Sequence, residues 1–175
     1  GIGSSFSNED YINSGAVIKD DPEDIFNHSE MILKVKEPQP SEIKFIKENQ
    51  IIFTFFHFAA DEIMTNNIID TGCISMAYET VQLNDGSLPI LTPMSEVAGR
   101  MSIQNGAKCL EGSMGGKGKL LGGVPGVNRS KVAVIGGGTV GTNAAKLASG
   151  LGAEVYILDI DMERLRYLDD VMPSN

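Results

Sequence analysis

Three glycines near the C-terminal end of the chain have the spacing of a phosphate-binding turn. Gly136, Gly138 and Gly141 fit the pattern G-x-G-x-x-G, and Asp159 follows the first of them by 23 positions. In such a turn the first glycine allows a tight bend, the second lets the backbone approach a pyrophosphate, and the third lets a helix pack on a strand. A carboxylate about twenty residues later accepts hydrogen bonds from a ribose. The pattern predicts a dinucleotide site that favours NAD over NADP, because the carboxylate repels a 2′-phosphate. The alternative is an ordinary strand–helix turn whose glycines serve packing alone.

The elements around these glycines support the dinucleotide interpretation. Residues 132–135 form a short apolar, β-branched run that is typical of a buried parallel strand. Residues 143–149 are small and compatible with a helix, which Gly150 and Gly152 would end. A second apolar run, 155–158, ends at the acid. The order of strand, glycines, helix, strand and acid predicts the first half of a Rossmann dinucleotide-binding domain.

A second group of chemically capable residues follows three apolar runs in the first half of the chain. Strands are expected at 31–37, 51–56 and 73–78, with helices at 41–49 and 60–71 between them. Alternating strands and helices predict an α/β fold with a parallel sheet, in which ligands bind beyond the carboxyl ends of the strands. The residues expected at that edge are Lys36, His57 and Glu79.

Each of these three residues also has a simpler explanation. An isolated histidine after a phenylalanine-rich strand is more often structural, and a strand-end lysine is by default a solvated charge. At a shared edge, however, His57 could exchange protons near neutral pH, and Lys36 could polarise a carbonyl and stabilise an oxyanion. Glu79 is expected to orient other groups or cap a loop, and Lys34 to be a solvated neighbour of Lys36.

Other stretches predict connecting elements. Short helices are expected to begin at residues 7–10 and 21–24, and a short strand at 16–19. A long helix is expected from Pro93 to about Glu111, with Ser95 as its N-cap. The glycine-rich segment 112–127 is interpreted as a hairpin-like loop, because it lacks the G-K-[ST] ending and the following helix of a phosphate loop.

Composition narrows the classes of partner. The chain of 175 residues has a net charge of −9 and a pI near 4.6, which argues against binding nucleic acid or anionic membranes. No apolar run is long enough to span a bilayer, and no signal-peptide pattern is present, so we expect a cytoplasmic protein. Cys73 and Cys109 lack metal-ligand spacing, so no metal site is predicted, and both are expected to be buried, reduced thiols.

Six stretches taken together resemble the alanine dehydrogenase family, and the resemblance covers nearly all 175 residues. Their combination is far more specific than the glycine motif alone. The same superfamily includes the NAD-binding α-subunit of proton-translocating transhydrogenase, which is the alternative, although the surroundings of Lys36, His57 and Ser95 look more like the dehydrogenase. The six stretches are 33–38 (LKVKEP), 53–60 (FTFFHFAA), 77–82 (AYETVQ), 93–100 (PMSEVAGR), 121–126 (LGGVPG) and 136–145 (GGGTVGTNAA).

The resemblance implies a function and a set of site residues. Family members convert L-alanine reversibly to pyruvate and ammonia with NAD, and usually form homohexamers. By resemblance, Lys36 holds the substrate carboxylate or carbonyl and His57 serves in acid/base catalysis. The remaining matched positions would contact NAD; beside the three glycines they are Ser95, Thr139, Val140, Asp159 and Arg164. The corresponding domains would be a substrate domain at 1–90 and an NAD-binding domain at 91–175.

The chain also departs from the family pattern. The family uses an arginine near its N-terminus and an aspartate well past the second Rossmann strand, and neither has a counterpart here. We therefore expect a partial chain, with part of a substrate domain and the first half of a dinucleotide domain. A third possibility follows, that of a truncated product without catalytic activity.

Overall fold

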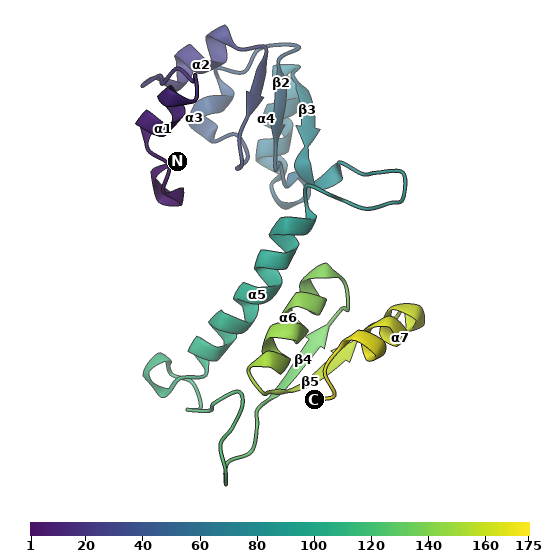
Figure 1. Cartoon of the computed structure of the whole chain (residues 1–175). Coiled ribbons are helices and arrows are strands. Elements are labelled where there is room, and N and C mark those ends of the chain that lie inside the picture. Colours follow the sequence, from purple (N-terminus) through teal and green to yellow (C-terminus); the bar gives the residue numbers. More distant parts are fainter. The chain divides into compact units, whose positions relative to one another are not determined.

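The computed structural model describes all residues, Gly1–Asn175, and the chain divides into two compact units (Figure 1). Unit 1 comprises Gly1–Gln82 and unit 2 comprises Leu83–Asn175. Each contains parallel strands connected through helices, so the predicted α/β class is confirmed.

Unit 1 is built on a three-stranded parallel sheet with the order β1-β2-β3. Ile32 of β1 pairs with Ile52 of β2, which pairs with Ser75 of β3. In chain order the elements are η1 Ile2–Ser4, α1 Asn8–Asn13, α2 Pro22–His28, β1 Met31–Leu33, α3 Pro40–Ile43, β2 Ile51–Thr54, η2 Phe58–Ala60, α4 Glu62–Thr71, β3 Ile74–Ala77 and η3 Tyr78–Thr80.

Side-chain caps begin the helices of unit 1 where the sequence indicates. Ser7 caps α1 in a capping box with Asp10, and Asp21 caps α2, which has proline in its first turn. Asp61 caps α4, and Gly72 ends it in the left-handed conformation that glycine adopts without strain. The predicted helix starts at 7–10 and 21–24 are therefore confirmed.

Three expectations for unit 1 were wrong in existence or length. Residues 16–19 form no strand, because no neighbouring strand pairs with them and Val17 remains exposed. The strand expected at 31–37 ends at Leu33, although the Lys34 N–H still bonds to the Phe53 carbonyl at 3.2 Å. The helix expected at 41–49 is only α3, and turns follow it.

One apolar core lies between the sheet and the helices of unit 1. It comprises Phe26, Ile32, Ile46, Ile52, Phe56, Met64 and Ile68. Gln50 is also buried there, and its side-chain amide donates to the Phe26 and Ser29 carbonyls at 2.8 and 2.7 Å. Burial of these groups fixes β2, at whose end His57 follows.

Unit 2 contains a parallel strand pair covered by a helix. Its elements are α5 Thr92–Cys109, η4 Gly112–Met114, β4 Lys131–Ile135, α6 Thr139–Gly150, β5 Glu154–Leu158 and α7 Met162–Val171. All five residues of β4 pair with β5, from Lys131 opposite Glu154 to Ile135 opposite Leu158. This is the strand–helix–strand unit that the glycine pattern predicts.

Small residues let α5 pack closely along α6 in unit 2 (Figure 1). A Cβ atom on Gly99 would lie 2.3 Å from the Val140 carbonyl oxygen, so only glycine permits this approach. The core beneath comprises Ile103, Leu121, Ala144, Ala148 and Ala153. Close packing of α5 on the start of α6 places Ser95 of α5 beside the glycine turn.

Two further findings concern the surface. No helix of the chain combines the length and the apolar character needed to cross a membrane. Both cysteines are free, but Cys109 is exposed and Cys73 is only partly buried, so the expectation of two buried thiols was wrong.

Candidate functional site

The three glycines of the motif have different physical roles in unit 2. Gly136 follows β4 with φ of +96°, a conformation that side chains disfavour. A Cβ atom on Gly141 would lie 1.8 Å from the Gly136 carbonyl oxygen, so the start of α6 packs directly on the turn. A Cβ atom on Gly138 would meet open space. The turn therefore requires glycine at positions 136 and 141, whereas Gly138 leaves open space for an approaching ligand.

The turn opens into a cavity of about 460 Å³ in unit 2. The α6 N-terminus contributes Thr139 and Val140, whose positions in the first helical turn leave backbone N–H groups without intrahelical partners. Such N–H groups and the positive end of the helix dipole attract anions. Among the residues that line the cavity are Ser95, Gly136, Gly138, Thr139, Val140 and Gly141. Six of the eight residues predicted to contact a cofactor thus share one cavity.

Ser95 reaches this cavity from within a helix, so its expected N-cap position was wrong. The helix α5 begins earlier, at Thr92, and the Ser95 N–H bonds to the Leu91 carbonyl at 3.1 Å. Proline in the first turn allows the earlier start. The Ser95 hydroxyl consequently has no capping role that would compete with a ligand.

Asp159 lies at the end of β5 and binds the backbone of the glycine turn. Its Oδ2 accepts from the Gly137 N–H at 2.5 Å, and its Oδ1 accepts from the Asp161 N–H at 2.9 Å. These two N–H donors, first that of Asp161, hold the pKa of Asp159 below its ordinary value, and Arg164 adds a smaller effect. The carboxylate is therefore ionised near neutral pH and links β5 to the turn.

Arg164 braces the same turn from α7. Its Nε donates to the Gly137 carbonyl at 2.6 Å, and its Nη2 donates to the Thr142 hydroxyl at 2.7 Å. The guanidinium also lies over the Tyr167 ring, 5.0 Å from its centroid. The sequence did not identify Gly137 and Thr142, because the G-x-G-x-x-G pattern does not restrict the residue between its first two glycines or the residue after its last one.

In unit 1, His57 lies at the carboxyl end of β2 in a strained backbone conformation. Its φ and ψ are 53° and 36°, in the left-handed region that non-glycine residues rarely adopt. The half-buried Glu79 holds this turn: its Oε1 accepts from the N–H groups of His57 and Phe56, at 2.7 and 3.1 Å. The predicted orienting role of Glu79 is thus what the geometry supports. The His57 side chain remains 52 % exposed.

Lys36 and Lys34 differ, although they lie two residues apart. Lys36 is exposed and forms no salt bridge, and its backbone carbonyl accepts from the buried Thr54 hydroxyl at 2.7 Å. Lys34 is instead part-buried and paired with Glu42, so its expected solvation was wrong. A free ammonium on an anchored backbone suits Lys36 to bind an anionic or carbonyl oxygen.

Glu37 contacts His57 and was not identified from the sequence. Its Oε2 lies 3.5 Å from His57 Nδ1. A hydrogen bond from its own backbone N–H lowers the pKa of Glu37, and His57 and Lys36 add to this effect. No motif marks this contact, since it depends on the direction in which the His57 turn points.

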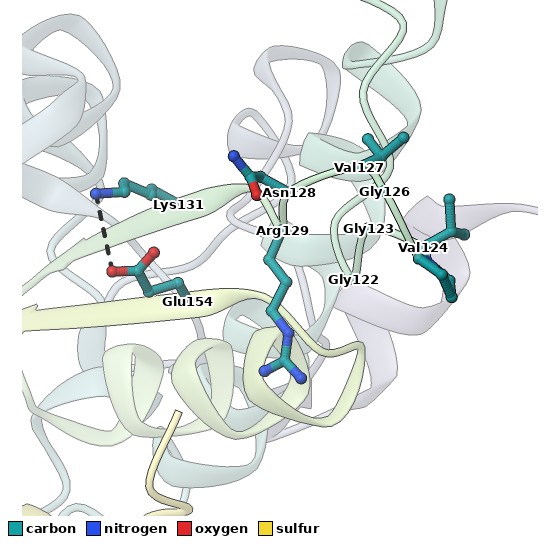
Figure 2. A pocket seen from close by; sticks show the side chains of 10 residues that line it. Gly122, Gly123, Val124, Gly126, Val127, Asn128, Arg129, Lys131 and Glu154 are labelled. Carbon is teal, nitrogen blue, oxygen red and sulfur yellow. Dashed lines mark ion pairs between the residues drawn. The ribbon is translucent and has the colours of Figure 1, made fainter.

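A larger hollow of about 810 Å³ lies in unit 2, between the 122–129 loop and the first residues of β4 and β5 (Figure 2). Figure 2 shows Lys131 paired with Glu154 there, at 3.8 Å. Val124 and Val127 pair across a tight turn, so the hairpin-like loop predicted at 112–127 is confirmed only for its last residues, and Gly112–Met114 form the short helix η4 instead. Because ligands of parallel sheets bind at the carboxyl ends of strands, this amino-end hollow is not the candidate site.

Family profiles cover nearly the whole chain. The profile described as "Alanine dehydrogenase/PNT, N-terminal domain" matches residues 1–98, and the one described as "Alanine dehydrogenase/PNT, C-terminal domain" matches residues 102–175. The chain belongs to the alanine dehydrogenase/PNT family. The family resemblance of the six stretches is thereby confirmed.

Individual relatives carry the dehydrogenase name. The chain is 55% identical over 171 residues to an alanine dehydrogenase of Methanococcus maripaludis and 56% identical to that of Geobacillus stearothermophilus. An alanine dehydrogenase of Bacillus subtilis is 53% identical. Each alignment covers 98% of this chain but 45–46% of the relative, so the chain spans about half the length of these curated relatives.

Solved structures share the fold. An L-alanine dehydrogenase superposes with a TM-score of 0.88 and 49% identity, over 99% of this chain and 48% of that one. A transhydrogenase from Sinorhizobium meliloti superposes with a TM-score of 0.77 but only 20% identity, over 97% of this chain and 50% of that one. The second match speaks for the fold alone.

Proposed function

We propose that the protein containing this chain catalyses the NAD-dependent oxidative deamination of L-alanine, with unit 1 as part of the substrate domain and unit 2 as part of the NAD-binding domain. The observation that carries the proposal is His57, held by Glu79 in a strained strand-end turn with its ring against Glu37, the residue that follows the exposed Lys36 in the chain. The chain's curated relatives named alanine dehydrogenase support the same reaction. From the family resemblance we also propose a cytoplasmic homo-oligomer, a hexamer in related enzymes.

The cavity at the glycine turn suits a dinucleotide. Open space beside Gly138 leaves room for a pyrophosphate against the backbone, and the α6 N-terminus offers it N–H donors. Asp159 retains lone pairs for ribose hydroxyl groups and would repel a 2′-phosphate. Ser95, Thr139 and Val140 would line the walls. Arg164 would act mainly by holding the Gly137 peptide in place.

Unit 1 would supply substrate binding and proton transfer. Lys36 would bind the carboxylate or carbonyl oxygen of the substrate and stabilise negative charge that develops there. His57 would move protons to and from the substrate and water as the imine carbon is hydrated. Glu79 would keep the His57 turn in position through the backbone N–H groups it accepts from.

The proposed reaction is balanced by one water molecule. L-alanine, NAD⁺ and water yield pyruvate, ammonium, NADH and a proton. When bound, NAD would supply the redox chemistry, as the acceptor of the hydride from the substrate Cα. The Cα–H bond breaks, the resulting imine adds water, and the C–N bond then breaks to release ammonia.

A transhydrogenase-type NAD-binding subunit is the alternative in the same fold. Such a subunit needs the nucleotide unit but has no requirement for an amino-acid site. The free Lys36 and the exposed, clamped His57 therefore favour the dehydrogenase. A truncated chain without catalytic activity remains the third alternative.

The deciding experiment measures NADH formation at 340 nm by the full-length gene product. We expect L-alanine to reduce NAD at alkaline pH, with D-alanine and NADP as the matched controls giving much slower rates. Pyruvate and ammonium should oxidise NADH in the reverse direction. NAD binding without any alanine-dependent reduction would refute the dehydrogenase and favour a nucleotide-binding subunit.

A further inference from the structure

One carboxylate oxygen of Glu37 is buried and lacks a hydrogen-bond partner. This atom, Oε2, is the one that lies 3.5 Å from His57 Nδ1. That separation suits a charge interaction but exceeds an ordinary hydrogen bond. Leaving a buried carboxylate oxygen unpaired costs free energy, so the ring N–H is the donor that would satisfy it. Hydrogen bonds of this type are often long without substrate and shorten when it binds.

The backbone around Glu37 is anchored on both sides. On one side the Lys36 carbonyl accepts from the buried Thr54 hydroxyl. On the other side Pro38 is fully buried, with less than 2 % of its surface exposed. The lowered pKa of Glu37 keeps its carboxylate charged near neutral pH. A fixed negative charge is therefore presented to one particular nitrogen of the His57 ring, Nδ1.

Resting on the proposed function, we propose that Glu37 is a positioning residue for His57, which it holds as the Nδ1–H tautomer with Nε2 toward the substrate. A neutral imidazole carries one proton, and a carboxylate beside Nδ1 favours that proton on Nδ1. Nε2 then carries the lone pair that accepts the substrate-derived proton. In Ser-His-Asp enzymes the aspartate likewise holds the Nδ1–H tautomer of the histidine, and Nε2 transfers the proton. Glu79 fixes the His57 backbone, while Glu37 fixes its ring.

The test replaces Glu37 in the full-length enzyme. Glu37→Gln keeps the shape but removes the charge, and kcat should fall about 10-fold to 100-fold, the loss typical of outer-shell carboxylates that orient a functional histidine. The KM for L-alanine should change less than about threefold, because Glu37 acts through His57. Glu37→Asp keeps the charge and should restore part of kcat. Glu42→Gln is the matched control, since it removes an equally charged partner of a lysine on the same segment.

A double-mutant comparison separates positioning from other roles. His57→Ala should lower kcat by about 100-fold or more, and adding Glu37→Gln in that background should change kcat less than about twofold. A full further loss in the His57→Ala background would overturn the proposal, as would unchanged kcat for Glu37→Gln with His57 intact. If His57→Ala itself left turnover normal, the proposed function of His57 would fail instead, so the two failures are distinguishable.

Discussion

The glycine turn of unit 2 and the strand-end cluster of unit 1 are built in opposite ways. In the turn the backbone itself makes the site, through the positive φ of Gly136 and the close contact at Gly141. In the cluster the side chains make the site, and distant residues such as Glu79 hold the backbone that presents them. At Gly136 and Gly141 the backbone site therefore has no room for a side chain, whereas the side-chain site depends on charge.

The largest effect should come from adding one carbon to the turn. Gly141→Ala places a Cβ atom 1.8 Å from a backbone oxygen, and neither α6 nor the turn can yield without separating. We expect a loss of about 3 kcal/mol in unfolding free energy, as for severe overpacking, and no measurable NAD binding. Urea unfolding and calorimetric titration of the full-length protein would measure both.

Gly138→Ala is the matched substitution. Its Cβ atom meets open space, and the φ of −65° at this position is allowed for alanine. The unfolding free energy should therefore change by less than about 1 kcal/mol, while the KM for NAD rises at least about tenfold, because the methyl group occupies the ligand's path. Equal destabilisation by the two substitutions would contradict the assignment of separate roles to the two glycines.

The next effect concerns charge in the strand-end cluster. Glu79→Gln removes the carboxylate that accepts from the N–H groups of Phe56 and His57. Hydrogen bonds to charged groups contribute about 1.5–3 kcal/mol, so the strained His57 turn should loosen. We expect kcat to fall about tenfold, with the KM for NAD unchanged because no cofactor contact is altered. Unchanged kcat together with an unchanged melting temperature would show that the hydrogen bonds from the Phe56 and His57 N–H groups to Glu79 are not needed.

The sequence predicted the turn better than the cluster for a physical reason. The roles of Gly136 and Gly141 follow from local backbone geometry, which a short motif encodes. The contact between Glu37 and His57 depends instead on the left-handed turn at His57, which Glu79 stabilises from 22 positions further along the chain. Sheet topology placed Lys36 and His57 at one edge, but only the structure distinguishes the free Lys36 from the paired Lys34.

Errors in the predicted elements have similar causes. Residues 16–19 have strand-like composition, yet a strand needs a partner and none lies beside it. Ser95 is a good cap by residue type, but Pro93 allows α5 to start one turn earlier. In both cases the preference of the residue types was overridden by their surroundings, which lack a partner strand in the first case and contain Pro93 in the second. Ser95 nevertheless lines the cavity, although it does so from within α5 and not as its N-cap.

A smaller effect should distinguish bracing from direct contact in the turn. Arg164→Gln removes the donors to Gly137 and Thr142, so the turn loses its support from α7. We expect the KM for NAD to rise about three- to tenfold with little change in kcat. Arg166→Gln, on the same helix, breaks only an exposed pair with Glu163 and should change neither value. Equal effects of the two substitutions would remove the bracing role.

The smallest effect is a pH-dependent contribution of Asp159 to stability. Its pKa in the folded protein lies below the ordinary 3.8, so its stabilisation is present above pH 3.8 and is lost as the pH falls through the folded value. The difference in unfolding free energy between wild type and Asp159→Asn should thus be constant from about pH 7 to 5 and shrink below about pH 3.8. Asp85, whose pKa the Ser87 hydroxyl and N–H lower, provides the control. Asp85→Asn should follow the same pH course in urea unfolding yet leave the preference for NAD over NADP intact, whereas Asp159→Asn should reduce it. A pH-independent difference for Asp159→Asn would mean that its carboxylate does not hold the turn.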